Sequence, residues 1–510
     1  MKHKKFFIGL ILFLAVILTG CYKPGPGYEP WKASGSGGIV GGGTVLVTPT
    51  GTPYVGEIQL TQNPQPTPTP NPTIVLPTPR LETLSHTVES GDTLRVLARR
   101  YQVSIGEISE VNNISNPNLI DVGQVLLIPP PSFEDVAPDF KIIPDSEFIY
   151  SPSNAYFDIA AFVNSQNGFL STYIDTIDGV SMSGAEILQR VSTEYSVNPR
   201  LLLALLEYQS EWVTSINPPE ETMVYPLGYY AAWYEGLYNQ LNWAANLLNE
   251  GYYLWKINGI TVWFLANGDV IQVEPTINPG TAGVLNLMQY LYNREGWELS
   301  ISEEGIYKTY LSLFGYPFSY TYEPLIPGDL NQPTLQLPIE DNTIWSFTGG
   351  PHGGWNTGSA WAAIDFAPPG ELLGCFESDA WVAASAPGEI VYSDHGAVIQ
   401  DLDGDGIWQT GWSILYMHIA GQDRVAVGTY LEAGDRIGHP SCEGGFSTGT
   451  HLHLARRYNG EWIAADGDLP LVLDGWVSVG YGVEYDGYLI KGDKTVEAWN
   501  GRSALNAIQR

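Results

Sequence analysis

The chain has 510 residues, of which 55 are acidic and 23 are basic, and its formal net charge is −32 at pH 7. A polymer this acidic is not drawn to nucleic acid or to anionic lipid by its overall field, which argues against electrostatic binding to either. Charge alone does not indicate a substrate.

The first 21 residues have the pattern of a secretory signal. Three lysines within the first five residues precede an apolar run at 6–18, which is shorter than the roughly 20 residues of a membrane span. The following Leu18-Thr-Gly-Cys21 resembles the bacterial lipobox, and this resemblance implies that Cys21 is lipidated and anchors the protein to a membrane. The alternative is an uncleaved anchor helix. Either reading predicts an extracytoplasmic protein, at the cell surface or in the periplasm.

Residues 22–85 are predicted to be a disordered linker. Glycine clusters fill 35–43 and alternating prolines fill 64–70, with few large apolar side chains to bury. The proline-rich half is expected to be extended, at about 3.1 Å per residue, and the glycine-rich half to be a flexible coil. The segment would tether the membrane anchor to the folded part.

Folded sequence is expected at 86–130, as a strand, a helix through Tyr101 capped by Ser90 or Asp92, a helix near 105–112 and a strand within 122–129. The opening Val-x-x-Gly-Asp-Thr-Leu and the ending Gly-Gln-x-Leu-x-Ile-Pro resemble the LysM module. This resemblance implies a small α+β (βααβ) fold that binds glycans containing N-acetylglucosamine, such as peptidoglycan. The stretches that match the family's sugar groove are roughly 91–94 and 116–120, and the residues singled out in them are Gly91, Asp92, Thr93, Leu94, Asn116 and Ile120.

Residues 131–180 are acidic and are predicted to be a second linker, and residues 181–325 a mainly α module. Asn198-Pro199 is a favourable start for the apolar helix 200–208. This order resembles a lysozyme-like domain, in which that helix ends in a catalytic glutamate. Here Gln209 stands at the matching position, and glutamine cannot protonate a glycosidic oxygen. The module is therefore predicted to be non-catalytic, and whether it binds glycan is left open. The alternative is a register shifted by two residues, which would bring Glu207 or Glu211 to the position of the acid.

The region 333–500 has the pattern of an antiparallel, two-layer β domain. Short β-prone runs separated by glycine-rich turns support this interpretation. The runs are 389–392, 397–399, 413–416, 424–425 and 436–438.

Six of the eight histidines fall in the last third of the chain. His451 and His453 flank one residue in an extended segment, so both project from one face of a strand. Upstream lie His352 in Gly-Gly-Pro-His-Gly-Gly, Asp365 in Ala-Ile-Asp-Phe, and His418 in Leu-Tyr-Met-His. This ordered set resembles the zinc endopeptidases of the lysostaphin and β-lytic type, which cut peptide bonds in bacterial cell walls.

The resemblance implies a role for each of these five residues. His352, Asp365 and His453 would bind one Zn²⁺ per peptidase domain, with water as a fourth ligand. His418 and His451 would be the non-ligand pair that act as general base and stabilise the tetrahedral intermediate. The residues alone leave open an exchange of roles between His451 and His453.

Two further features concern the same domain. With Cys21 lipidated, Cys375 and Cys442 form an even pair in an oxidising compartment, which predicts a disulfide. Asp401, Asp403 and Asp405 have the spacing of a calcium loop, although position twelve is not the usual glutamate. The alternative for this segment is a solvated acidic hairpin.

The sequence therefore predicts a membrane-anchored zinc metalloendopeptidase that hydrolyses peptide bonds in peptidoglycan stem peptides or cross-bridges and is targeted to the wall by LysM. Its predicted partners are peptidoglycan and, through Cys21, the membrane, but not nucleic acid. The alternative is a non-catalytic wall-binding scaffold that recruits or activates another hydrolase.

Overall fold

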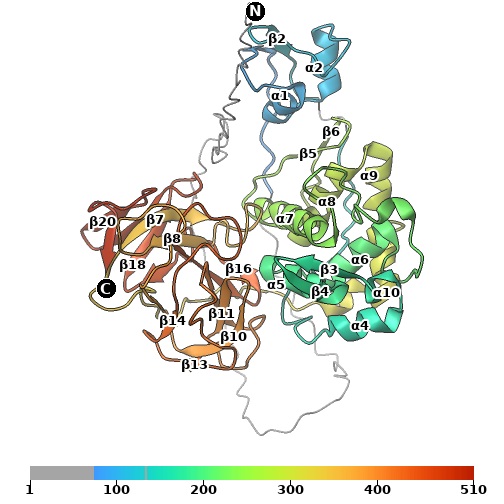
Figure 1. Ribbon diagram of the computed structural model, residues 1–510. Helices are drawn as coiled ribbons and strands as arrows, with labels where there is room; N and C mark the ends of the chain where they lie inside the picture. The colour runs from blue at the N-terminus through green and yellow to red at the C-terminus, as the bar shows by residue number, and fades with distance from the viewer. Residues whose placement is uncertain (1–73, 133–134) are drawn as a thin grey trace, which may run out of the picture. The chain divides into compact units, whose positions relative to one another are not determined.

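The computed structural model describes residues 74–132 and 135–510, which form a small βααβ segment, a mainly helical segment and a C-terminal β segment (Figure 1); these segments are called domains below. The predicted signal, the lipidation of Cys21 and the linker as far as residue 73 lie outside the described residues. Within the described ranges, no helix combines the length and apolar character that a membrane crossing needs.

The βααβ domain has the predicted element order. Its elements are β1 (Leu84–Thr87), α1 (Leu94–Tyr101), α2 (Ile105–Val111) and β2 (Val125–Ile128), with β1 and β2 antiparallel. The predicted cap of α1 was wrong, because the Thr93 hydroxyl accepts from Val96 N at the helix start. The Asp92 carboxylate instead accepts from Glu89 N and pairs with His86.

Part of the predicted linker is ordered, so the expectation of disorder was wrong for residues 74–85. Ile74 is buried in the core of the helical domain. The backbone N–H of Val75 donates to Asn258 Oδ1, and the Asn258 amide donates back to the Val75 carbonyl. The apolar residues Ile74, Val75 and Leu76 explain the difference, since they supply surface to bury at the end of a proline-rich stretch.

The predicted second linker, 131–180, is also largely folded. It contains α3 (Asp145–Phe148), α4 (Ile159–Gln166), η1 (Phe169–Ser171) and β3 (Ile174–Ile177). The acidic composition wrongly favoured a linker, because some of the carboxylates accept hydrogen bonds inside the folded core. Glu147 is fully buried, where it accepts hydrogen bonds from Arg200 and Tyr310.

The helical domain contains the predicted apolar helix as α6 (Pro199–Ser210). The side-chain oxygen of Asn198 caps α6 by accepting a hydrogen bond from Arg200 N, and Pro199 lies in the first turn. The leucines of α6 are buried. The remaining elements are β4 (Val180–Ser183), α5 (Gly184–Tyr195), α6 (Pro199–Ser210), η2 (Glu220–Thr222), α7 (Leu237–Lys256), β5 (Val262–Phe264), β6 (Val270–Gln272), α8 (Pro279–Leu291), α9 (Arg294–Ser300), α10 (Ile306–Phe314) and η3 (Pro317–Tyr320).

The C-terminal domain is built on a nine-stranded antiparallel sheet in the order β13-β10-β11-β12-β15-β8-β7-β21, with β16 paired to β15. A four-stranded sheet, β17-β18-β19-β20, and the pair β14-β9 complete it. The strands are β7 (Ile344–His352), β8 (Ala363–Ala367), β9 (Val382–Ala383), β10 (Gly388–Asp394), β11 (Ala397–Asp401), β12 (Trp412–Met417), β13 (Tyr430–Leu431), β14 (Arg436–Gly438), β15 (Leu452–Tyr458), β16 (Glu461–Trp462), β17 (Val472–Leu473), β18 (Trp476–Gly480), β19 (Gly487–Lys491), β20 (Lys494–Glu497) and β21 (Ala507–Gln509).

One of the predicted strands is absent. Residues 424–425 lie in a loop between two turns, where Val425 N donates to the Ile437 carbonyl without a strand ladder. The other predicted runs fall within β10, β11, β12 and β14.

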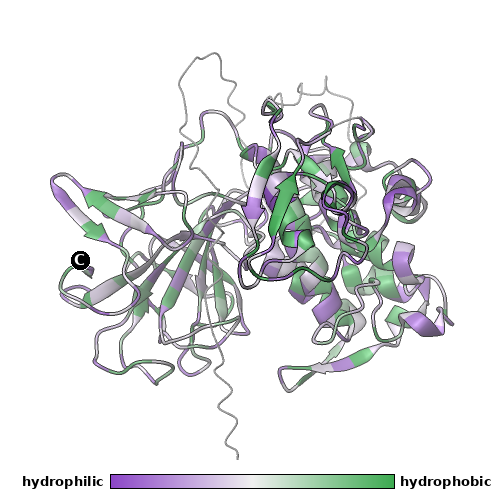
Figure 2. Ribbon diagram, turned by 90° about the horizontal axis from the view of Figure 1, so that it is seen from above, coloured by the Kyte–Doolittle hydropathy of each residue, from purple (hydrophilic) through white to green (hydrophobic). Residues whose placement is uncertain are grey.

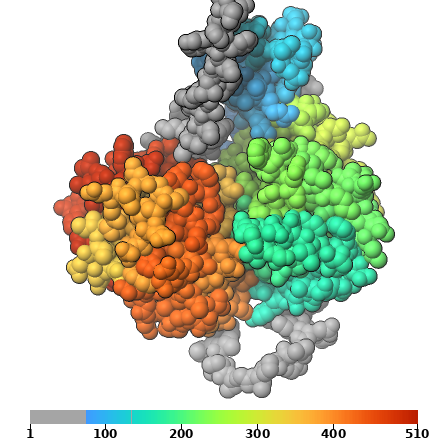
Figure 3. All heavy atoms as spheres, viewed as in Figure 1, coloured from blue at the N-terminus to red at the C-terminus, as the bar shows by residue number. Residues whose placement is uncertain are grey.

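The two faces of the large sheet pack into different cores. Val398 and Tyr416 belong to the core of the β domain, whereas Ile399, Leu415 and Ala455 belong to a core that also holds residues of the helical domain. This alternation follows from the period of two along each strand. Hydrophobic stretches recur along the helices and strands (Figure 2), and Figure 3 shows the outer surface of the same segments.

Candidate metal centre

Three adjacent strands bring the predicted ligands together. His352 ends β7, Asp365 lies in the middle of β8, and His453 is directly opposite Asp365 in the β8–β15 register. A register shift places Gly349 opposite Asp365. A Cβ at Gly349 would lie 2.6 Å from Asp365 Oδ2, so this strand position needs glycine to leave room for the carboxylate.

The three donor atoms form a small, buried triangle. His352 Nε2 lies 3.0 Å from His453 Nδ1, and both lie 3.3 Å from Asp365 Oδ1. Three ligands at about 2.0–2.1 Å from a tetrahedral zinc ion are separated by about 3.3 Å. Asp365 Oδ1 is buried and has no hydrogen-bond partner within the described structure. An orphaned carboxylate oxygen between two imidazole nitrogens fits a metal ion.

Backbone carbonyls orient both imidazoles. His352 Nδ1 donates to the Gly350 carbonyl at 2.8 Å, and His453 Nε2 donates to the Gly354 carbonyl at 3.0 Å. Each bond fixes the tautomer that turns the other nitrogen towards Asp365. The ring of Tyr485 stacks on His352, with the centroids 4.2 Å apart.

The electrostatics of the triad keep Asp365 ionised. Burial by itself would raise the pKa of Asp365, but the nearby imidazoles of His352 and His451 hold it well below its ordinary value. Burial lowers the pKa of His453. Burial also works to lower the pKa of His352, but the adjacent Asp365 carboxylate outweighs it and leaves that pKa raised.

The two remaining predicted histidines lie beside the triad. His418 Nδ1 donates to the Glu443 carbonyl and His451 Nδ1 donates to the Gly449 carbonyl, at 2.9 and 2.8 Å. Their ring centroids are 4.4 Å apart, and His451 Nε2 lies 3.7 Å from Asp365 Oδ1. Burial, followed by the neighbouring His451 and His453, lowers the pKa of His418 to about 3. His418 is therefore neutral at physiological pH, as a proton acceptor must be.

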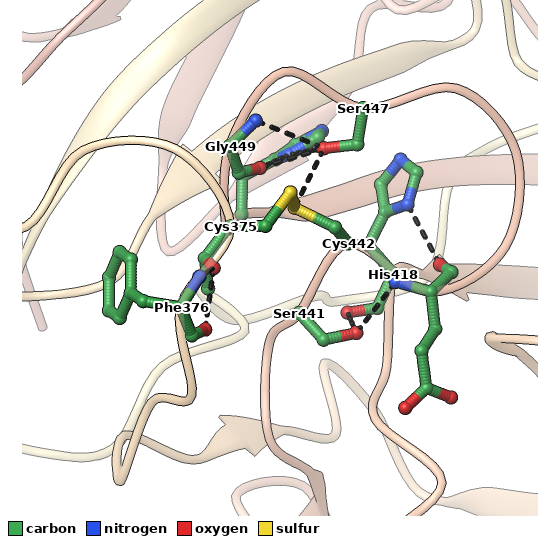
Figure 4. Close-up of a disulfide and its surroundings, with 10 residues drawn as sticks. Cys375, Phe376, His418, Ser441, Cys442, Ser447 and Gly449 are labelled. Carbon is green, nitrogen blue, oxygen red and sulfur yellow. Dashed lines mark hydrogen bonds between the residues drawn. A yellow bond between two sulfur atoms is a disulfide. The ribbon is translucent and has the colours of Figure 1, made fainter.

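The structure contains the predicted disulfide. Cys375, in the loop after β8, is bonded to Cys442, in the segment before His451, with the Cα atoms 5.8 Å apart. Figure 4 shows Ser447 next to this bridge, and its hydroxyl lies 3.3 Å from His451 Nδ1. Thr450 N also donates to the Gly374 carbonyl. Together these contacts position the loop that leads into His451. The carbonyl partners carry no sequence signal, because any residue supplies them.

The predicted glycan groove of the βααβ domain coincides with a cavity of about 360 Å³. Asp92, Thr93, Leu94 and Ile120 line this cavity, whereas Gly91 and Asn116 are not among its lining residues. Pro117 and Asn118, which also line the cavity, fall within the predicted stretch 116–120, whereas the lining residues Arg95, Ile105 and Asn267 lie outside the predicted groove.

The acidic loop after β11 brings its carboxylates together as the spacing predicts. Ligand atoms of Asp401, Asp403 and Asp405 lie within 4.8 Å of one another, with Asp401 buried and the other two exposed. The loop itself uses several of these oxygens, since Asp401 accepts from Gly406 N and Asp405 accepts from the Thr410 hydroxyl. Calcium binding stays a prediction.

The polar side chains at the end of α6 have internal partners. Glu207 accepts from the backbone N–H groups of Val213 and Thr214, and Gln209 Oε1 accepts from the Tyr292 hydroxyl. Glu207 thus ties down the chain that follows α6. The absence of a catalytic acid from the helical domain stays a prediction.

Two family models match the chain. Residues 86–129 match the LysM domain, and residues 141–326 match the LasA N-terminal domain. The second match begins 40 residues before the predicted boundary at 181, in agreement with the folded elements found there. The lysozyme-like character of this domain stays a prediction.

Similar proteins include Protease LasA of Pseudomonas aeruginosa, which is 26% identical over 310 residues, or 56% of this chain and 68% of the relative. The N-acetylmuramoyl-L-alanine amidase XlyA of Bacillus subtilis is 43% identical over 61 residues, or 12% of this chain and 20% of the relative. Similar solved structures include the M23 metalloprotease pseudoalterin (22% identity, 33% of this chain and 96% of that chain, TM-score 0.28) and the catalytic domain of lysostaphin from Staphylococcus simulans (27% identity, 24% and 90%, TM-score 0.18). The comparisons bear out the resemblance that the motifs predicted, since the chain is similar to Protease LasA over 310 residues and its residues 86–129 match the LysM domain.

Proposed function

We propose that the chain is an extracytoplasmic zinc metalloendopeptidase that hydrolyses peptide bonds in peptidoglycan stem peptides or cross-bridges. The observation that carries this proposal is the buried triangle of His352, Asp365 and His453 around an unpartnered carboxylate oxygen. Similarity to Protease LasA supports the class of reaction.

Within this proposal each group has a chemical task. Zinc held by His352, Asp365 and His453 would polarise the scissile carbonyl and lower the pKa of bound water. His418 is neutral, and its Nδ1 is engaged with the Glu443 carbonyl, so its Nε2 is the atom left to accept a proton. In the same way His451 donates through Nδ1 to Gly449, which leaves Nε2 to contact the developing oxyanion.

The LysM domain would supply affinity for the wall. Its cavity is large enough for part of a glycan chain, since ligand pockets range upwards from about 300 Å³. Binding there would hold the peptidase near its substrate and raise the effective substrate concentration without changing the chemistry. Lipidation of Cys21, which would add a membrane anchor, belongs to the same proposal.

The competing function is a non-catalytic scaffold that recruits or activates another hydrolase. Both functions require wall binding, but only the peptidase requires a metal. The test is clearing of purified cell walls by the full chain, alone, with a chelator and after zinc is restored, with His418→Ala as a metal-retaining control. Clearing that the chelator stops, zinc restores and His418→Ala lacks supports the peptidase. Wall binding without clearing in zinc would favour the scaffold.

A further inference from the structure

A hairpin of the helical domain is inserted into the LysM domain. This hairpin, residues 262–272, consists of β5 and β6 and the turn between them. Its Phe264 is 5% exposed and belongs to the LysM core cluster together with Leu94 and Ile108. The guanidinium groups of Arg95 and Arg99 lie over the Phe264 ring, at 5.8 and 5.4 Å from its centre.

Polar contacts fix the hairpin turn against both LysM helices. Arg95 of α1 donates to the Ala266 carbonyl at 2.5 Å, and Ile105 N at the start of α2 donates to the Gly268 carbonyl at 3.2 Å. Gly268 has φ +91, and a Cβ there would lie 2.6 Å from the Ile105 side chain. The turn therefore approaches α2 as closely as a glycine allows.

This turn places Asn267 on the wall of the LysM cavity. Asn267 is exposed and lines the cavity together with residues from the two LysM loops, among them Thr93 and Asn118. Its amide donates once to the Asp269 carboxylate, and its Oδ1 accepts from Asp269 N. One N–H and one lone pair of the amide remain for a ligand.

We propose that the hairpin of the helical domain completes the LysM groove, so that Asn267 hydrogen-bonds an N-acetylated glycan bound there. The carbonyl of Ala266 also holds Arg95, which lines the same cavity, in place. The glycan site is then shared by two domains. This inference rests on the proposed glycan binding by LysM and adds the second domain to it.

The test measures binding of the N-acetylglucosamine tetramer to the full chain by calorimetry. Asn267→Ala is compared with Asn118→Ala, which removes the same amide from a LysM loop, and with Asn239→Ala, an exposed position on α7 that does not line the cavity. Loss of one or two hydrogen bonds weakens binding by about three- to tenfold. We expect this loss for Asn267→Ala and Asn118→Ala and wild-type affinity for Asn239→Ala.

Three results would overturn the inference in distinguishable ways. If Asn267→Ala binds the tetramer with wild-type affinity while Asn118→Ala binds it more weakly, the LysM domain binds glycan but the hairpin is not part of the site. Absence of tetramer binding by the wild-type chain refutes the proposed glycan binding and this inference together. Equal weakening of Asn239→Ala would show a general effect of substitution. Hydrogen exchange adds an independent readout, because bound tetramer should protect residues 265–269 as well as 116–120, and protection confined to 116–120 excludes the hairpin.

Discussion

Separate alanine substitutions at His451 and His453 should affect zinc binding differently, although both should reduce hydrolysis. His451→Ala leaves the donor triangle of 3.0, 3.3 and 3.3 Å intact, so near-stoichiometric zinc should remain. A positioned acid–base or charge-stabilising group contributes about 10²–10⁴-fold, or about 3–5 kcal/mol at the barrier, and activity should fall by that factor. His453→Ala removes a triangle corner, so zinc and hydrolysis should both be lost.

Stability gives a second measure of the same difference. A metal present at about 100 times its dissociation constant stabilises the folded state by about 2.7 kcal/mol. Zinc should therefore raise the melting temperature of the wild type and of His451→Ala, but not that of His453→Ala. His395→Ala, in the turn between β10 and β11, is the matched histidine control and should keep zinc and activity.

The assay is zinc per protein by mass spectrometry, together with melting temperature and the rate of cleavage of a glycine-containing peptide. If His451→Ala loses zinc while His453→Ala keeps it, the ligand and proton-transfer roles must be exchanged. If neither substitution alters hydrolysis, the peptidase proposal fails.

Three further predictions concern other parts of the chain. Burial and the nearby Glu323 raise the pKa of Asp145 to about 7, so the folded state holds this proton more tightly than the unfolded chain, and wild-type stability should fall as pH rises from about 4 to about 7. Relative to wild type, Asp145→Asn should gain up to about 4 kcal/mol at pH 8 but little at pH 4, measured by urea unfolding. Breaking the Cys375–Cys442 bridge, which closes a loop of 67 residues, should cost about 4 kcal/mol in thermal unfolding, and an unchanged melting temperature after reduction would contradict this. Calcium at millimolar concentration should give a heat of binding that Asp401→Asn abolishes; no heat with the wild type would rule the site out.

The metal centre was predictable because its chemistry needs particular side chains. Imidazoles and a carboxylate have few substitutes as zinc ligands, so His352, Asp365 and His453 stood out in the sequence. The contacts that orient them are backbone carbonyls, such as that of Gly350, which any residue could supply. The sequence could therefore name the ligands but not the hydrogen bonds that position them.

Domain boundaries were less predictable. The amino-acid composition of a segment indicates how polar the segment is on average, but not which of its polar side chains have buried hydrogen-bond partners. Glu147 contributed to the acidic character that favoured a linker, yet Arg200 and Tyr310 pair with it inside the core. Asn267 gave no signal at all, because its place in the LysM cavity depends on an insertion from a domain about 140 residues further along the chain. Long-range packing of this kind has no local pattern.

Strand β15 runs from the metal centre to side chains that contact the helical domain. His453 lies near its beginning, and near its end the buried guanidinium of Arg457 lies over the ring of Trp462 and donates to the Thr193 carbonyl. The two domains should consequently melt as one cooperative unit in scanning calorimetry. Zinc bound at one end of the strand should then delay the unfolding of tryptophans in the helical domain, such as Trp255, which make no contact with the metal.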